Sequence, residues 1–499
     1  MNELLQHLKT DYLLVNSTNK YLVEYSELSE NARYTLTGFS GSTGDALITP
    51  LGVFLFVDGR YHTQADMEAK DGVNVVKLSI GQSQDEEIAK HIENNSTFTI
   101  VATKVSQSRL EKFKKLLEDK NVKFQLIDFD PINNYTEQHD SKNIEKVNYL
   151  PKTYTPTMPT YITNLEEVSY LTGRRDFSKD YTSKVWGKLF IDGKNPPLLF
   201  ASDKTAKEFL MNYEGEIQVD KNSINAYEYS LIKNPVHKVS EIKELKSVKT
   251  DEEIELYKKA FEATDKAISA IRKFIEDNEN LSEYDISEQL HKEFLKYGAK
   301  LLSFKSIVAI NQNSALAHYS KASKDVILKN GDLVLIDCGA YYKSGLATDI
   351  TRVFVKGEGT DLQKKVYTTV LKTFLNCYNS TFNTGYEIDS LAHSILDNNI
   401  EGFSFSHGLG HGIGINVHEA PPALNKTEIA HTEFLDNMTY TIEPGLYNPE
   451  YFGVRLENSC YRKNGKNCSF VKIGFEGKLI DYSLLTEQEQ LWLKEFEIL

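Results

Sequence analysis

Four carboxylates in the second half of the chain follow or interrupt runs of apolar residues, which is unusual for acidic side chains. They are Asp337, Asp349, Glu443 and Glu457. A buried strand does not normally contain an unpaired carboxylate, because burying its charge costs on the order of several kcal/mol. Each one alone can be a charge at a strand end or on the surface. Their apolar or glycine-containing flanks instead favour a shared binding site.

Asp337 and Asp349 lie in two neighbouring runs that are typical of strands, separated by a turn at residues 343–345. Adjacent antiparallel strands can direct both side chains to one point. We place Asp349 inside the second strand, on the same face as Thr351, because alternate strand residues point the same way. The alternative is one aspartate at a strand end and the other on the surface, and this pair alone does not exclude it.

A glycine-rich segment, residues 407–418, contains His407, His411 and His418. Three histidines and four glycines fall within these twelve residues. Glycine lets the backbone adopt unusual angles and approach a ligand closely. A single histidine is more often structural than a ligand, but three in one such segment favour a metal or catalytic site.

Four carboxylates and one imidazole form an oxygen-rich ligand set, which suits hard or borderline divalent ions. We expect two divalent metal ions, with Mn²⁺ preferred and Co²⁺ or Zn²⁺ as alternatives. Their positive charges would balance the four carboxylates. A hydroxide held between them would be a nucleophile at neutral pH, because metal binding lowers the pKa of water. Both ions would also stabilise the oxyanion of a tetrahedral intermediate.

This pattern resembles that of the pita-bread metallopeptidases, which include methionine aminopeptidase, prolidase and aminopeptidase P. The resemblance implies five metal ligands: Asp337, Asp349, His411, Glu443 and Glu457. It also implies that Asp349 and Glu457 bridge the two metals. Glu443 would in addition act as the general acid and base.

The same resemblance implies roles for four more residues. His318 and His418 match the two catalytic histidines that contact the substrate, and His318 would stabilise the intermediate or donate a proton. His407 matches a histidine of the pocket in the proline-specific branch. Arg455 matches a residue that supports the metal ligands, and we include it among the substrate-binding residues.

Several segments outside the ligand set resemble aminopeptidase P in its three-domain form. They are residues 36–44, 57–61, 165–174 and 484–493. Methionine aminopeptidase lacks the N-terminal domains, and prolidase usually lacks the middle domain and this tail. The resemblance therefore implies a metal-dependent Xaa-Pro aminopeptidase. Such an enzyme releases the N-terminal residue from peptides with proline in second position, by attack of a hydroxide held between the metals on the Xaa-Pro carbonyl.

Two alternatives stay open. The first is an Xaa-Pro dipeptidase (prolidase), which cleaves dipeptides only. The second is a non-catalytic binding module of the same fold. Relatives of that kind lose metal ligands, whereas all five ligand positions here hold residues that can bind metal, so this alternative is less favoured.

The chain departs from the family pattern in the spacing of Asp337 and Asp349, which is one residue longer than usual. We place the additional residue in the hairpin at 341–345, where an insertion costs little. An insertion inside a strand would instead turn Asp349 to the opposite face. The middle domain is also shorter than in the long three-domain enzymes.

The sequence patterns of the strands and helices that must position these residues predict an α/β (α+β) chain with three domains. We expect an N-terminal creatinase-like domain at 1–135, a shortened middle creatinase-like domain at 136–245, and a pita-bread catalytic domain with a short tail at 246–499. Local patterns predict a hairpin over 45–57, helices at 84–95, 107–119 and 361–378, and a capping box at Thr250 and Glu253.

Composition limits the partners of the chain. The 57 basic and 71 acidic side chains give a net charge of −14, which argues against nucleic acid and against an anionic membrane. No apolar run is long enough to span a bilayer, and the first residues do not resemble a signal peptide. Four scattered cysteines suit the reducing cytoplasm. By resemblance we also expect a homodimer that acts on peptide substrates.

Overall fold

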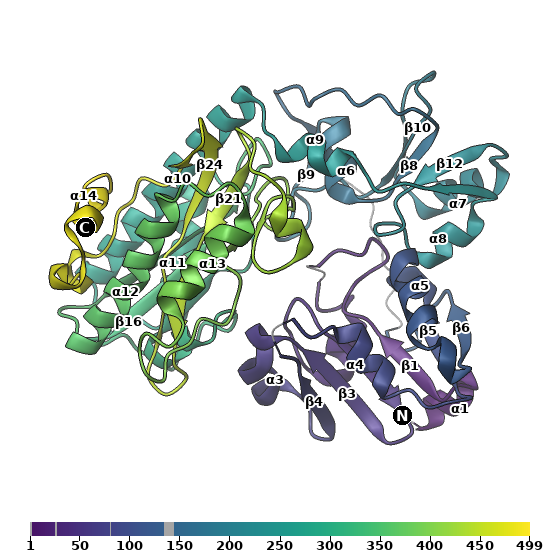
Figure 1. The fold of residues 1–499 in the computed structure, drawn as a ribbon, viewed down its shortest axis with the longest axis horizontal. Helices are drawn as coiled ribbons and strands as arrows, with labels where there is room; N and C mark the ends of the chain where they lie inside the picture. The colour runs from purple at the N-terminus through teal and green to yellow at the C-terminus, as the bar shows by residue number, and fades with distance from the viewer. Residues whose placement is uncertain (1, 25–26, 80, 134–143) are drawn as a thin grey trace. The chain divides into compact units, whose positions relative to one another are not determined.

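The computed structural model describes residues 2–24, 27–79, 81–133 and 144–499. They form two compact units (Figure 1). Unit 1 comprises Met1–Lys142, Thr153–Leu171 and Val185–Glu241, and unit 2 comprises Asn143–Lys152, Thr172–Lys184 and Ile242–Leu499. The three-domain division stays a prediction, and part of its first boundary falls on residues 134–143, outside the described residues. Within the described residues, no helix is long and apolar enough to cross a membrane.

The first sheet of unit 1 has six strands in the order β4-β3-β2-β1-β5-β6. The strands are β1 Tyr12–Val15, β2 Asp45–Thr49, β3 Gly52–Val57, β4 Val73–Lys77, β5 Thr97–Val101 and β6 Lys123–Ile127. The helices are α1 Asn2–Leu8, α2 Ala32–Thr37, α3 His62–Glu68, α4 Gln84–Lys90 and α5 Gln107–Leu116. The predicted hairpin is β2–β3. The two predicted helices form, but both end earlier than expected, at Lys90 and Leu116.

The second sheet of unit 1 has five strands in the order β11-β10-β8-β12-β13. They are β8 Thr160–Ile162, β10 Lys188–Ile191, β11 Leu198–Phe200, β12 Glu216–Val219 and β13 Asn234–His237. The accompanying helices are α6 Leu165–Thr172, α7 Asp203–Asn212 and α8 Ala226–Leu231. An apolar cluster between helices and strands, which includes Phe190, Leu210 and Ile217, forms the core of this layer.

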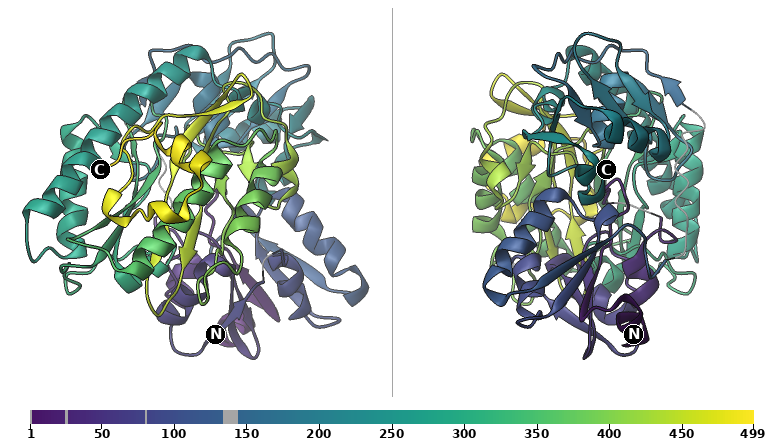
Figure 2. Two further views of the ribbon diagram at one scale, coloured as in Figure 1. Left: turned by 60° about the vertical axis from the view of Figure 1, so that its left-hand side comes forward. Right: turned by 90° about the vertical axis from the view of Figure 1, so that its right-hand side faces the viewer.

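Unit 2 contains the longest helices of the described chain and short antiparallel strands, with the helices on the outside of the strands (Figures 1 and 2). The helices are α9 Ile242–Ser247, α10 Asp251–Asp277, α11 Glu283–Lys296, α12 Asp361–Tyr378, α13 Gly385–Leu396 and α14 Glu487–Leu493. The capping box at Thr250 and Glu253 is present at the start of α10, and α12 has the predicted bounds. Apolar residues of α12 and α13 form one large core with the strands.

The strands of unit 2 form several small sheets. They are β7 Ile144–Lys146 with β9 Arg174–Asp176, β14 Leu301–Leu302 with β17 Ala340–Tyr341, β15 Ile307–Ile310 with β16 Leu333–Cys338 and β18 Ile350–Val355, β19 Gly410–His411 with β20 Ala423–Leu424, β21 Thr439–Ile442 with β24 Asn458–Lys463 and β25 Lys466–Ser469, and β22 Gly445–Tyr447 with β23 Gly453–Arg455. The turn between β17 and β18 contains Gly345, which has a positive φ of 68°, as glycine permits.

Gly339 lets the two halves of the β16–β18 hairpin approach closely. A Cβ at this position would lie 1.8 Å from the carbonyl oxygen of Thr348 and 2.5 Å from Ser303 Oγ. Ser303 Oγ donates a hydrogen bond to the same Thr348 carbonyl at 2.8 Å. Because Thr348 immediately precedes Asp349, this contact helps to set the position of that carboxylate.

We predict that Gly339→Ala lowers the free energy of unfolding by about 3 kcal/mol or more, since the added methyl group meets backbone that must move. Gly359→Ala is the matched control. Its Cβ would come closest to the end of the Leu479 side chain, at 2.6 Å, which can rotate away. Urea unfolding measures both losses. Equally small losses for the two variants would contradict the close approach at Gly339.

Candidate metal centre and active site

Asp337 and Asp349 lie on the same side of the β16–β18 pair. Asp337 pairs with Thr351 and Cys338 with Ile350 in antiparallel register, so Asp349 occupies the next position of the face that carries Thr351. Asp349 was expected inside a strand. It instead immediately precedes the first residue of β18 and lies between the Tyr341–Ala347 bridge and the β16–β18 ladder.

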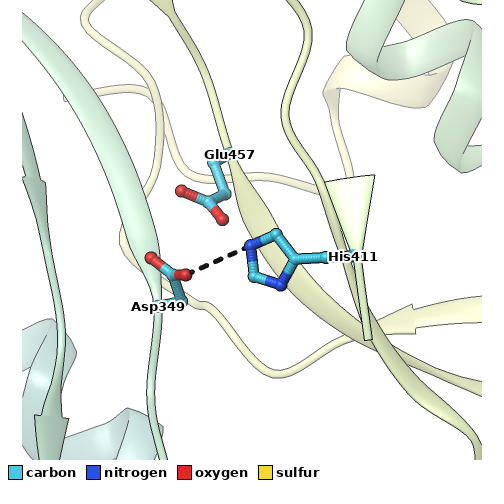
Figure 3. Close-up of side chains that lie close together, drawn as sticks. All are labelled: Asp349, His411 and Glu457. Carbon is cyan, nitrogen blue, oxygen red and sulfur yellow. Dashed lines mark ion pairs between the residues drawn. The ribbon is translucent and has the colours of Figure 1, made fainter. Parts of the chain in front are cut away.

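Three of the predicted ligands converge on one point (Figure 3). Asp349, His411 and Glu457 each offer a ligand atom, and these atoms lie within 4.8 Å of one another. His411 Nε2 is 3.5 Å from Asp349 Oδ2 and 3.4 Å from Glu443 Oε1, so Glu443 adjoins the cluster. The residues come from different elements: His411 from β19, Glu443 from the link β21–β22, and Glu457 from the link β23–β24.

The orientation of His411 suits a metal ligand. Its Nδ1 lies 3.1 Å from the carbonyl oxygen of Gly412. A carbonyl only accepts hydrogen bonds, so Nδ1 carries the proton and Nε2 presents its lone pair to the carboxylates. The backbone N–H of His411 donates to Thr441 Oγ1 at 3.1 Å, which fixes the position of the residue. A lone pair and carboxylate oxygens that converge in this way suit a cation.

Asp337 joins the cluster through Arg455. The Arg455 guanidinium donates to Asp337 Oδ2, to Thr351 Oγ1 at 3.2 Å and to Tyr447 Oη at 2.8 Å. Thr351 Oγ1 in turn donates to Glu457 Oε2 at 2.7 Å. Arg455 is only 2 % exposed and contacts these residues of the site. A direct contact of Arg455 with substrate stays a prediction.

Two buried oxygens of the cluster point to a bound cation. In the part of the chain that the structure describes, Asp337 Oδ1 and Glu457 Oε1 are buried and make no hydrogen bond. Buried polar atoms are nearly always satisfied by some partner. Divalent cations would satisfy such oxygens and would also balance the charge of the surrounding carboxylates, so the residues present fit a metal centre.

The pKa values of the carboxylates reflect their crowding. Burial first, and then the charges of neighbouring carboxylates, raise the pKa of Asp349 and of Glu457 well above the usual range. Burial also raises the pKa of Asp337, and that of Glu443 to about 7, although the charge of Arg455 opposes both shifts. Without cations, these groups therefore hold protons at pH values where carboxyl groups are ordinarily ionised.

His418 lies beside the ligand cluster. Its ring centroid is 4.2 Å from that of His411, and the ring planes are inclined by 72°. The Asn416 side chain holds this part of the loop, because its Nδ2 donates to the His418 carbonyl at 2.8 Å. Lys184 Nζ donates to Asn416 Oδ1 at 3.0 Å and thereby fixes the orientation of the amide. The structure thus places His418 near the predicted metals, and its catalytic role stays a prediction.

His407 connects to the site through Tyr447. His407 Nδ1 lies 2.8 Å from the carbonyl oxygen of Gly408 and therefore donates to it. Nε2, at 2.6 Å, accepts from Tyr447 Oη, which itself accepts from Arg455. A continuous chain of hydrogen bonds thus links His407, Tyr447, Arg455 and Asp337. Arg455 donates to both of its neighbours in this chain, and Tyr447 donates to His407.

His318 lies in the turn after the short helix η4 Asn311–Ala315 and is half-buried. Ser314 Oγ of this helix donates to the Gly453 carbonyl at 2.9 Å and accepts from the Gly453 N–H at 2.8 Å. Gly453 begins β23, which leads to Arg455 and Glu457. The turn with His318 is therefore fixed to the strand that approaches the cluster, while contact of His318 with substrate stays a prediction.

Sequence reasoning missed Tyr447 and undervalued Thr351. Thr351 had a signal, because it shares a strand face with Asp349 and so had to point at the same site. For Tyr447, the residues that neighbour it in the sequence carried no signal of a role in the site. Its link to Arg455 arises from the β22–β23 hairpin, which pairs Gly445 with Arg455 and Tyr447 with Gly453. Its link to His407 arises from a bridge between Ser404 and Tyr447, two residues far apart in sequence.

Comparisons with known proteins agree with this arrangement. The model of metallopeptidase family M24 matches residues 255–463, and that of the creatinase/prolidase N-terminal domain matches residues 1–134. An uncharacterized peptidase of Methanocaldococcus jannaschii is 31 % identical over 368 residues, covering 72 % of this chain and 94 % of the relative. A probable Xaa-Pro aminopeptidase P of Coprinopsis cinerea is 26 % identical, covering 99 % of this chain and 93 % of the relative.

Among solved structures, an X-prolyl aminopeptidase from Caenorhabditis elegans has a similar fold. The two structures superpose with a TM-score of 0.88, and their sequences are 21 % identical. The match covers 97 % of this chain and 90 % of the chain from Caenorhabditis elegans. It is described as a cytosolic enzyme with a di-nuclear active site. This likeness confirms the predicted fold class, with creatinase-like domains before a pita-bread domain. The chain therefore belongs to metallopeptidase family M24, in its aminopeptidase P branch.

Proposed function

We propose that this chain is a metal-dependent Xaa-Pro aminopeptidase, a hydrolase that releases the N-terminal residue from peptides with proline in second position. One observation carries the proposal: Asp349, His411 and Glu457 converge on one point with Glu443 adjoining them. The similarity to probable Xaa-Pro aminopeptidases P extends over 99 % of the chain, which supports the proline preference.

The five ligands suit two divalent cations, and we propose Mn²⁺ because four of the five offer carboxylate oxygen. Asp337, Asp349, His411, Glu443 and Glu457 are the residues that would hold them. When bound, the two cations would supply an activated water and polarise the scissile carbonyl. The Arg455 guanidinium holds Asp337, and Thr351 Oγ1 holds Glu457, so both carboxylates keep a fixed orientation toward the centre.

Glu443 is the residue that we assign to proton transfer. Its Oε1 lies 3.4 Å from His411 Nε2, and its Oε2 lies 4.0 Å from Arg455 Nε, so its carboxylate adjoins both the ligand cluster and the arginine. It takes a proton from the attacking water and returns it to the proline nitrogen as the peptide bond breaks. The products are a free amino acid and a shortened peptide that begins with proline.

The histidines complete the proposed site. His418, which adjoins His411, and His318 would donate hydrogen bonds to the oxygen that becomes negatively charged during the reaction. His407, held by Tyr447 Oη, would form part of the pocket for the proline ring. We also propose a homodimer and a cytoplasmic location, on the basis of resemblance to aminopeptidase P.

One prediction from the proposed function concerns peptide length. A Xaa-Pro-Xaa tripeptide is expected to be cleaved at the Xaa-Pro bond, with release of one amino acid, because an aminopeptidase accepts a chain beyond the proline. Mass spectrometry of the products measures this, with Xaa-Pro dipeptide and Xaa-Ala-Xaa tripeptide as parallel substrates. Cleavage of the dipeptide alone would favour prolidase. Cleavage of neither proline peptide by the Mn²⁺-loaded protein would contradict the proposed function.

Another prediction concerns pH and stability in the metal-free protein. The raised pKa values of Asp349, Glu457 and Glu443 mean that the folded state binds more protons than the unfolded state above the ordinary carboxyl pKa. The free energy of unfolding therefore falls as pH rises through this window. Metal binding requires ionised ligands, so stabilisation by metal grows over the same range.

Thermal unfolding with EDTA and with Mn²⁺ measures this effect. The Tm difference between the two conditions is expected to widen by several degrees from about pH 5.5 to about pH 8. Glu457→Gln is the control, because it removes one of the crowded acids and should flatten the pH dependence of the metal-free Tm. A Tm difference that is the same at both pH values would contradict the assignment of the cluster as a metal centre.

A further inference from the structure

The carboxylate of Glu283 is completely buried at the first residue of α11, yet it has no part in the metal centre. It accepts four hydrogen bonds. Ile310 N–H and Asn313 Nδ2 donate to Oε1 at 2.7 and 2.9 Å. Tyr319 Oη and Ser323 N–H donate to Oε2 at 2.7 and 2.9 Å. Both oxygens of one buried anion are thus satisfied by a single stretch of chain.

These four donors bracket His318. We name residues 310–323 the His318 stretch: two of the donors precede the histidine and two follow it. Tyr319, the next residue along the chain, also packs against the main apolar core of unit 2. The two hydrogen bonds between Ser314 and Gly453 tie the same stretch to β23. His318 therefore lies between two fixed points, one on α11 and the other on the strand that leads to the metal ligands.

A purely local role for Glu283 does not explain this arrangement. An exposed acidic residue in the first turn stabilises a helix through the favourable interaction of its charge with the helix dipole, but Glu283 is buried and all four donors lie outside α11. The helix has its own cap, because Ser282 and Asp285 form a complete capping box. Hydrogen bonds to a charged acceptor are roughly twice as strong as neutral ones, so the buried anion chiefly orders the His318 stretch.

We propose that Glu283 is a positioning residue that holds His318 in the geometry required for peptide cleavage. The inference rests on the proposed function and deepens it. Glutamine cannot replace the glutamate, since its amide has one oxygen and its NH₂ group would face two donors. Glu283→Gln therefore keeps the size of the side chain but releases one side of the His318 stretch.

A double-mutant cycle with His318→Ala tests this role. Glu283→Gln is expected to lower kcat on a Xaa-Pro-Xaa peptide about 10- to 100-fold, as a misplaced catalytic group does, with a much smaller change in KM. In the His318→Ala background the same change is expected to lower kcat by less than about twofold, because the two residues act as one unit. Equal effects of Glu283→Gln in both backgrounds would overturn the proposal.

Glu293→Gln is the matched control on the same helix. Glu293 is also buried, but its hydrogen bonds come from Gln289 and Lys296 of α11 itself. The kcat of the Glu293→Gln variant is expected to equal that of the wild type. Metal content is expected to be the same in all variants. Loss of metal in Glu283→Gln would overturn the proposal, since the effect would then act through the ligands.

A readout independent of activity separates this inference from the proposed function. Trypsin is expected to cut Glu283→Gln at Lys321 or Lys324 at least about fivefold faster than the wild type or Glu293→Gln, because the stretch opens locally. Unchanged cleavage would overturn the inference even if the wild type proves inactive on proline peptides. Should Glu283→Gln not fold, Tyr319→Phe removes a single donor and is expected to give a smaller effect on kcat, again absent in the His318→Ala background.

Discussion

Asp349, Glu443 and Glu457 lie around His411 in unit 2, where Asp349 and Glu457 are buried and Glu443 is partly buried, so their negative charges repel one another when the groups are ionised. Burial of this kind is unfavourable unless cations neutralise the charges. Arg455 neutralises part of the charge through its contact with Asp337, and the remainder suits divalent ions. The cluster forms where the segment before β18, strand β19 and the links β21–β22 and β23–β24 meet, and the close approach at Gly339 helps to place Asp349 there. The chemistry proposed for the chain follows from this cluster.

Around this centre, each histidine with a proposed role is held by a different buried polar group. Tyr447 orients His407, and the pair Lys184 and Asn416 holds the loop of His418. Glu283 holds the stretch that carries His318. Hydrogen bonds to buried groups add to the apolar packing of these segments and help to provide the rigidity that catalysis needs. Substitutions far from the metals can thus change activity without changing metal content.

Much of the fold was predictable because it depends on local pattern. The capping box at Thr250, the helix Asp361–Tyr378 and the β2–β3 hairpin are set by residues close in sequence. The alternation of strand residues likewise predicted that Asp349 and Thr351 share a face. Lys184 and Glu283 could not be found in this way, because each contacts residues remote in sequence whose proximity is created only by the tertiary fold. The same holds for the contact of Tyr447 with His407, which a bridge between Ser404 and Tyr447 creates.

The central proposal is that Asp337, Asp349, His411, Glu443 and Glu457 would hold two divalent cations. An anomalous difference map from a crystal of the Mn²⁺-loaded protein measures this directly. The account predicts two peaks within bonding distance of Asp349 and Glu457, with His411 bound to one of them through Nε2. A single peak, or peaks that do not contact Asp349 and Glu457, would contradict it.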